Sequence, residues 1–310
     1  MIKAITVTNY LGDSIKLDLA RPEKSGFAVK SITGLGPGKA TINTTEVSTN
    51  DGGLYNSARK SKRNIVISLA FLTENAVEDA RQRTYKYFPL KKKVTLLIET
   101  DNRTAKIEGV VESNEPNIFS ASEGTDISII CPNPSFYSAE VYNTMFYGAE
   151  PNFEFPFSNE SLVEDDVITE EESRLLEMSI INTRLEESII YEGDSETGIT
   201  IRMHAFGEVK NITIYNMNTR ETMHIDTNKI ALITGSGFVA GDDIIICTEK
   251  GNKSVLLLRS GKYINVLNCL ERNPDWFVLN KGENIFVYSA EVGINNMDFK
   301  IEHKTVYEGV

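Results

Sequence analysis

Short runs of β-branched and apolar residues, separated by turn residues, follow one another along almost the whole of this 310-residue chain. Several runs alternate apolar with polar positions, as strands with one buried face do. In the first half they occupy residues 2–8, 14–20, 39–47, 64–72, 94–100, 104–111 and 125–131. In the second half they occupy residues 198–205, 210–217, 221–226, 242–250, 253–259, 275–280, 283–290 and 297–304. The spacing predicts a mainly β protein.

One segment of the first half, residues 73–90, has a helical period instead. Its apolar stripe consists of Val77, Ala80, Thr84 and Phe88, spaced three and four apart. Asn75 can cap the first turn with Glu78 three residues later, and Pro89 marks the end. The second half has no helical period. We therefore expect a β-barrel or β-sandwich with one helix, followed by an antiparallel β-sandwich.

Charge divides the chain into two parts. Residues 1–140 carry 18 Lys and Arg against 16 Asp and Glu, a net charge of +2, whereas residues 141–310 carry 14 against 28, a net charge of −14. An acidic stretch around residues 148–178 separates the two runs of strands and is expected to be a linker. Its adjacent glutamates, residues 170–172, are expected to be a solvated face, since catalytic carboxylates need a fixed separation. The predicted domains are residues 1–147 and 179–310.

The sequence G-L-G-P-G-K at residues 34–39 has the composition of a phosphate-binding loop but not its pattern. A P-loop requires Gly five positions before Gly38 and Ser or Thr after Lys39, where this chain has Thr33 and Ala40. The residues that follow alternate as a strand does, so no helix N-terminus would face a phosphate. The loop is predicted to be a turn.

Catalytic and metal-binding motifs are not found in the sequence. Its three cysteines and three histidines have no metal-ligand spacing, and no nucleophile motif occurs. We expect no enzyme activity, catalytic residue, metal or cofactor. The acidic second half argues against nucleic acid as a partner. No run of 18 apolar residues predicts membrane insertion, and no signal-peptide pattern opens the chain, so synthesis in a cytoplasm is expected.

Several blocks resemble the distal tail proteins of long-tailed phages that infect Gram-positive bacteria. The first is "SITGLGPGKATINTTEVSTNDGGLYNSARKSKRNIVISLAF", followed by "ISIICPNPSFYS". Others are "YEGDSETGITIRM", "VKNITIYN", "GNKSVLLLRSGKYINVLNCLERNPDWFVLNKGENIFVY" and the terminal "VYEGV". The blocks occur in the order expected for that family and cover nearly the whole chain. The acidic segment is longer than the linker expected for the family.

The resemblance implies a structural protein of the phage tail tip. Its first domain would form a homo-hexameric ring between the tail tube protein and the tail-associated hub protein. Its second domain would be a galectin-like sandwich, which in some relatives carries receptor-binding proteins. The protein would then be located in the virion and made in the cytoplasm of the host bacterium.

The polar, basic segment of residues 48–63 has two interpretations. It is either a solvated hairpin tip or an arm that contacts a neighbouring subunit or tube ring; the family resemblance favours the arm. The candidate arm residues are Asp51, Gly52, Tyr55, Arg59, Lys60, Lys62 and Arg63. Replacing its four basic residues by Ser is expected to weaken assembly and leave the monomer folded.

A binding module for host-surface carbohydrate, without a ring role, is the alternative. Trp276, the only tryptophan, is a weak candidate for stacking on a sugar, but it begins the apolar run W-F-V-L. A buried core position is therefore expected for Trp276, and also for Tyr263 and Tyr288. A hydrolase of envelope polymers would need paired carboxylates in a cleft, which the sequence does not indicate.

Overall fold

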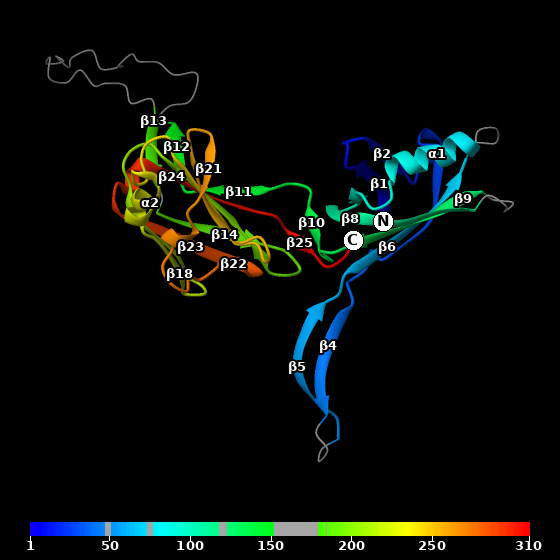
Figure 1. Ribbon diagram of the computed structural model, residues 1–310, viewed down its shortest axis with the longest axis horizontal. Helices are drawn as coiled ribbons and strands as arrows, with labels where there is room; N and C mark the ends of the chain where they lie inside the picture. Colours follow the sequence, from blue (N-terminus) through cyan, green and yellow to red (C-terminus); the bar gives the residue numbers. More distant parts are fainter. Residues whose placement is uncertain (47–50, 73–76, 118–122, 152–178, 184) are drawn as a thin grey trace, which may run out of the picture. The chain divides into compact units, whose positions relative to one another are not determined.

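The structure is a computed structural model of the chain, and it describes all residues except 47–50, 73–76, 118–122, 152–178 and 184 (Figure 1). The described residues form two compact units. Unit 1 comprises residues 1–141, 192–197 and 304–310, and unit 2 comprises residues 142–191 and 198–303. Sequence analysis assigned residues 192–197 and 304–310 to the second domain, whereas their contacts place them in unit 1. Most of the expected linker lies outside the described residues.

Unit 1 contains a nine-stranded antiparallel sheet. Seven strands lie in the order β2-β1-β7-β8-β9-β6-β3, and β10 pairs with both β8 and β25. Their bounds are β1 Ile2–Asn9, β2 Ser14–Asp18, β3 Phe27–Thr33, β6 Arg63–Phe71, β7 Lys93–Thr100, β8 Thr104–Asn117, β9 Gly124–Cys131, β10 Phe136–Ser138 and β25 Val306–Tyr307. The sheet does not close into a barrel, although its edge strands β2 and β3 approach each other.

Helix α1 (Val77–Tyr87) covers the core of unit 1, as the helical period predicts. Ala80, Thr84 and Phe88 are each at most 2% exposed, which confirms these three positions of the predicted stripe, and Val77, the fourth, is half-buried. Asn75, the expected cap, lies outside the described residues. Alternating side chains of β1, β6, β7 and β9, such as Val7, Ile67 and Ile127, complete this core.

In the part of the chain that the structure describes, the strands β4 (Ala40–Glu46) and β5 (Gly53–Lys60) pair only with each other and form a separate two-stranded hairpin (Figure 1). Every residue in both strands is exposed. The hairpin confirms the strand predicted at residues 39–47 and places a second strand within the polar segment 48–63.

Unit 2 is a sandwich of two antiparallel sheets, as the second half of the sequence predicts. One sheet has the order β11-β24-β16-β19-β20-β21 and the other β14-β23-β17-β18. The first contains β11 Tyr142–Met145, β16 Thr200–Ala205, β19 Asp243–Cys247, β20 Ser254–Arg259, β21 Lys262–Asn265 and β24 Met297–His303. The second contains β14 Glu186–Tyr191, β17 Lys210–Asn216, β18 Glu221–Ile225 and β23 Gly282–Val292. Short strands β12 (Tyr147–Pro151) and β13 (Ser179–Thr183) pair with each other, and β15 (Thr197–Gly198) and β22 (Val278–Leu279) are shorter still.

The core of unit 2 lies between the two sheets. Tyr288, Phe299 and Phe146 pack there, with the Tyr288 and Phe299 rings stacked at 4.6 Å between centroids. The absence of a helix in this half was predicted wrongly: α2 spans Thr227–Thr234. The Asp226 side chain accepts the Asn228 N–H at its start, and Gly235 ends it in the left-handed region at φ 84°.

Within the described residues, no helix is both long enough and apolar enough to cross a membrane.

Candidate assembly hairpin and its base

The β4–β5 hairpin has two chemically different faces. Side chains two positions apart on a strand share a face with those of their paired residues. On one face lie Ala40, Ile42 and Thr44 of β4 with Lys60, Ala58 and Tyr55 of β5. Ile42 is 61% and Tyr55 67% exposed. This set of six residues is here called the apolar face of the hairpin.

The opposite face carries hydroxyl and amide groups. Asn43 donates to the Ser57 hydroxyl at 3.0 Å, and Asn56 donates to the Thr45 hydroxyl at 2.6 Å. A bulge between Asn43 and Thr44 leaves Asn56 without a paired residue on β4. The opposite face also carries one large apolar side chain, Leu54, which is paired with Thr45 and is 62% exposed. The apolar face has two, Ile42 and Tyr55, and neither face buries them within the hairpin.

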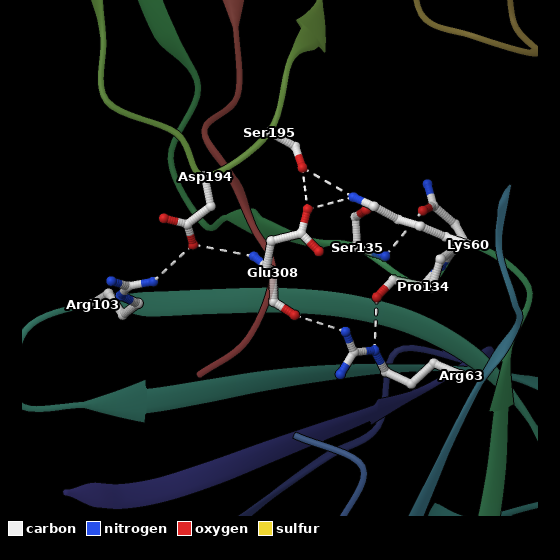
Figure 2. Close-up of polar contacts among 9 residues, drawn as sticks. Lys60, Arg63, Arg103, Pro134, Ser135, Asp194, Ser195 and Glu308 are labelled. Atoms are coloured by element: carbon white, nitrogen blue, oxygen red, sulfur yellow. Dashed lines mark hydrogen bonds and ion pairs between the residues drawn. The ribbon is translucent and has the colours of Figure 1, made fainter. Parts of the chain in front are cut away.

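Arg63 anchors the hairpin to unit 1 and is not part of its exposed surface. It is 6% exposed at the start of β6. Its guanidinium donates to the carbonyl oxygens of Pro134 at 2.7 Å and Glu308 at 2.8 Å (Figure 2), and lies 4.6 Å over the Phe136 ring. The expectation that Arg63 belongs to the contacting arm needs correction, because a residue buried within its own unit cannot be replaced without affecting the fold.

The glycine loop forms the other side of the Arg63 site. The guanidinium also donates to the carbonyl oxygens of Gly34, at 2.7 Å, and Gly36. Gly34 has φ 84°, and a Cβ there would collide with the Asn64 carbonyl. The glycines therefore let the backbone turn close to β6 so that its carbonyls face a cation. These contacts confirm the loop as a turn.

The C-terminal residues close the base of the hairpin. Lys60, the last residue of β5, forms an ion pair with Glu308, and its ammonium lies 2.9 Å from the Ser195 hydroxyl (Figure 2). Ser195 also contacts the Glu308 carboxylate, and the Val310 N–H donates to the Leu35 carbonyl at 3.0 Å. Partial burial on its own would raise the pKa of Glu308, but hydrogen bonds from Lys60 and Ser195 outweigh it and lower that pKa.

A second contact ties the same segments together. The Arg103 guanidinium lies 3.5 Å from Asp194 and 4.6 Å over the Tyr307 ring, and Asp194 accepts the Glu308 N–H at 3.2 Å (Figure 2). Four separated segments, the glycine loop, residues 134–136, residues 194–195 and residues 306–310, thus meet at the base of the hairpin. Sequence reasoning did not predict this meeting, since nothing in a single sequence pairs Arg63 with Glu308.

The remaining candidate arm residues lie along the hairpin. Asp51 and Gly52 are at its outer end, where Gly52 has φ 93°, and both are exposed. Arg59 and Lys62 are exposed near its base, and neither forms an ion pair with a described residue. The sequence predicted the exposure of these residues, but it did not identify Ile42, because that residue reads as one position of an ordinary strand.

The aromatic residues of unit 2 offer little for a sugar site. Trp276 is half-buried against the core, with the Lys253 ammonium 5.0 Å from its ring centre. Tyr288 is buried as expected. Tyr263 was expected to be buried, but it is 65% exposed on the edge strand β21, where no further strand among the described residues covers it.

Comparison with known proteins gives similarity in structure only. No protein-family profile and no curated protein matches the sequence. The crystal structure of the Dit (gp 19.1) protein of phage SPP1, described as a paradigm of the hub adsorption apparatus in phages infecting Gram-positive bacteria, matches with a TM-score of 0.61 at 12% identity. The match covers 97% of this chain and 99% of that chain.

A chain of the phage P2 baseplate, in its activated conformation with Ca, matches with a TM-score of 0.52 at 12% identity. It covers 100% of both chains, and a second structure of that baseplate, with Sr, gives a TM-score of 0.50. These similarities confirm the fold predicted from the resemblance. The chain therefore has the fold of the distal tail (Dit) proteins, and its structural neighbours belong to phage baseplates.

Proposed function

We propose that this chain is a structural protein of a phage tail tip, in which six copies form a ring. The ring would join the tail tube protein on one side to the tail-associated hub protein on the other, and would support the receptor-binding apparatus. The observation that carries the proposal is the match to SPP1 Dit over 97% of this chain, which includes both units. A non-catalytic role and a location in the virion follow from the same proposal.

The exposed hairpin is the part of unit 1 that suits an inter-subunit contact. Two strands without a third are marginal in water, and Ile42 and Tyr55 leave apolar area exposed there. Contact with a neighbouring copy would bury that area, and the free charges of Arg59 and Lys62 would favour an acidic surface. The proposed ring domain is unit 1, residues 1–141 with 192–197 and 304–310, and the proposed outward-facing sandwich is unit 2.

Light scattering over a concentration series tests the ring. One chain has a mass of 34.6 kDa, so a six-fold ring would have about 208 kDa. A discrete species of that mass supports the proposal. A monomer at every concentration, also after addition of tube and hub proteins, would refute it.

The double variant Ile42→Ser, Tyr55→Ser tests the hairpin itself. It removes the two large side chains of the apolar face without touching a hydrogen bond, so we expect loss of the ring and an unchanged unfolding midpoint of the monomer. The matched control is Ile190→Ser, Tyr263→Ser, which removes two similarly exposed side chains of unit 2. Equal assembly of both variants would exclude the apolar face as the contact.

Recognition of host-surface carbohydrate is the alternative function, and the exposure of Tyr263 is the one feature that favours it. Binding of the full chain to purified Gram-positive cell walls, compared with its Tyr263→Ala variant, tests it. Retention that disappears in the variant would support the alternative, and an absence of retention would exclude it.

A further inference from the structure

The open seam of the unit 1 sheet contains a cavity that lies outside the hairpin and its base. The edge strands β2 and β3 approach each other without pairing, and the short helix η1 (Pro22–Lys24) lies beside both. Arg83 of α1 reaches into the seam, where it donates to the Ser25 carbonyl at 2.8 Å and lies 5.1 Å over the Phe27 ring. The cavity has a volume of about 490 Å³.

Cationic side chains dominate the lining of this cavity. There are four of them: Lys16 on β2, Arg21 directly before η1, Lys24 on η1 and Arg83 on α1. The single carboxylate in the lining is Asp18, and Ser14, Ile15 and Ser25 complete it. We call this cavity the seam pocket.

Two of the four cations have charged partners nearby. Lys16 donates to both oxygens of Glu99, at 2.8 and 2.7 Å, and Arg21 lies 3.8 Å from Asp18. The Asp18 carboxylate is mainly occupied by the turn, since it accepts the N–H groups of Ala20 and Arg21, and these backbone bonds lower its pKa.

Lys24 and Arg83 form no ion pair with a described residue. The Arg83 guanidinium donates one hydrogen bond to a carbonyl oxygen, that of Ser25, which carries no full charge. Four cations against Asp18 and Glu99 leave an excess of two positive charges around the seam pocket. Glu23, next to Lys24, is not in the lining.

We propose that the seam pocket binds a phosphate group, either free or esterified to a polyol. A phosphate monoester concentrates about two negative charges on one group, which matches the excess, and it offers several oxygens to guanidinium and ammonium donors from separate elements. The volume exceeds that of a single phosphate and lies in the range of small-molecule sites, which leaves room for the polyol beside the Ser14 hydroxyl. The proposal is independent of ring formation.

Calorimetric titration of the full chain tests the seam pocket, with inorganic phosphate, glycerol 3-phosphate and a poly(glycerol phosphate) chain as probes. The test variant is Arg21→Gln, Lys24→Gln, because Arg21 is 63% exposed and neither side chain supports the core. The control is Lys262→Gln, Arg272→Gln, which removes two exposed positive charges from unit 2. We expect the test variant to raise the Kd for at least one probe tenfold or more, and the control variant to leave it within twofold.

The pattern of probes identifies the source of the phosphate. Binding of all three probes assigns the site to phosphate in general, whereas binding of poly(glycerol phosphate) alone assigns it to a phosphodiester polymer. Absence of binding at millimolar probe, or equal binding by parent and test variant, would overturn the proposal. Tighter binding of a hexaglutamate peptide than of any phosphate probe would also overturn it, in favour of an acidic protein partner.

Discussion

At the scale of single residues, Arg63 shows that a basic residue in a charged segment can be a buried structural cation and not part of a binding surface. In the sequence it is the last of four basic residues among the five at positions 59–63, and it reads as part of a charged surface. In the structure its guanidinium meets four backbone carbonyls and an aromatic ring. Burial lowers the pKa of Arg63, and the nearby charge of Glu308 partly offsets this, yet an arginine stays protonated at neutral pH. It is an internal cation that holds loop carbonyls together.

Replacing Arg63 by Ala should therefore cost stability rather than assembly alone. Carbonyl groups that lose a charged donor inside the fold remain unpaired, so the free energy of unfolding is expected to fall by about 3 kcal/mol or more. Urea denaturation followed by circular dichroism measures it. The exposed Arg59→Ala serves as control and is expected to stay within about 0.5 kcal/mol of the parent. Similar values for both variants would contradict the anchoring role of Arg63.

His303 makes unit 2 sensitive to acid. It is 8% exposed, its ring stacks on Tyr142, and its Nδ1 has no hydrogen-bond partner among the described residues. Burial lowers its pKa from the ordinary 6.5, so the fold holds it neutral while the unfolded chain takes up a proton. Its contribution to stability is therefore complete above pH 6.5 and is lost as the pH falls below that value.

The variant His303→Leu should remove this part of the pH dependence. Unfolding of unit 2 can be followed by the fluorescence of Trp276, the only tryptophan. Between pH 7 and pH 5 the variant is expected to lose less stability than the parent. The control His224→Gln replaces a half-buried ring that is hydrogen-bonded to Thr213. It still contains His303, so its stability should fall with pH as much as that of the parent. If the stability of His303→Leu fell with pH as steeply as that of the parent, His303 would not be the source of this pH dependence.

At the scale of elements, the hairpin depends on a segment almost 250 residues away in the chain. Lys60 is held by Glu308, whose pKa is lowered in the fold, so this contact is complete above the ordinary carboxyl value of 4.5 and is lost as the pH falls through the lowered value. The variant Glu308→Gln removes the charge at any pH. Hydrogen exchange of residues 53–60 is expected to accelerate several-fold in this variant, because the base of the hairpin opens more often.

A control for that experiment is Glu283→Gln, which removes a carboxylate on unit 2 that accepts from Ser188. Exchange in the hairpin should then match the parent. Unchanged exchange in Glu308→Gln would mean that pairing between β4 and β5 alone sets the opening of the hairpin.

At this scale, the elements predicted correctly from the sequence are those long enough for an apolar period to repeat within them. Strands with alternating burial, such as β6 and β24, and the eleven-residue α1 were predicted because a period repeats within them. The eight-residue α2 was missed, since two turns carry little periodicity; its caps, Asp226 and Gly235, were the available signal. The exposure of Tyr263 was missed because being on an edge strand is a property of the sheet.

At the scale of the whole molecule, unit 1 is discontinuous in sequence. Residues 192–197 and 304–310 belong to it, although each of these segments follows a stretch of unit 2 along the chain. Phe136 of β10 pairs with Tyr307 of β25, Val306 is buried, and Val310 packs against the core. A reading along the chain assigns such segments to the domain that precedes them, because the pairing partner is more than 160 residues away. The site at the base of the hairpin was unpredictable for the same reason.

Deletion of residues 304–310 should consequently destabilise unit 1, although most of unit 1 lies at the other end of the chain. Loss of β25 exposes the edge of β10, and loss of Glu308 removes one of the four backbone acceptors of Arg63, so the thermal unfolding of unit 1 is expected at a lower temperature. Unit 2 ends at His303 and contains Trp276, so its fluorescence transition should stay at the parent's temperature. In the deletion variant, circular dichroism should therefore report the unfolding of unit 1 at a lower temperature than the fluorescence of Trp276 reports the unfolding of unit 2.

The control is the exposed Lys304→Ser, in the same segment, which should leave both unfolding temperatures at the parent's values. If the deletion instead lowered the fluorescence transition alone, the C-terminal residues would belong energetically to unit 2, and the discontinuous division of the chain would be refuted.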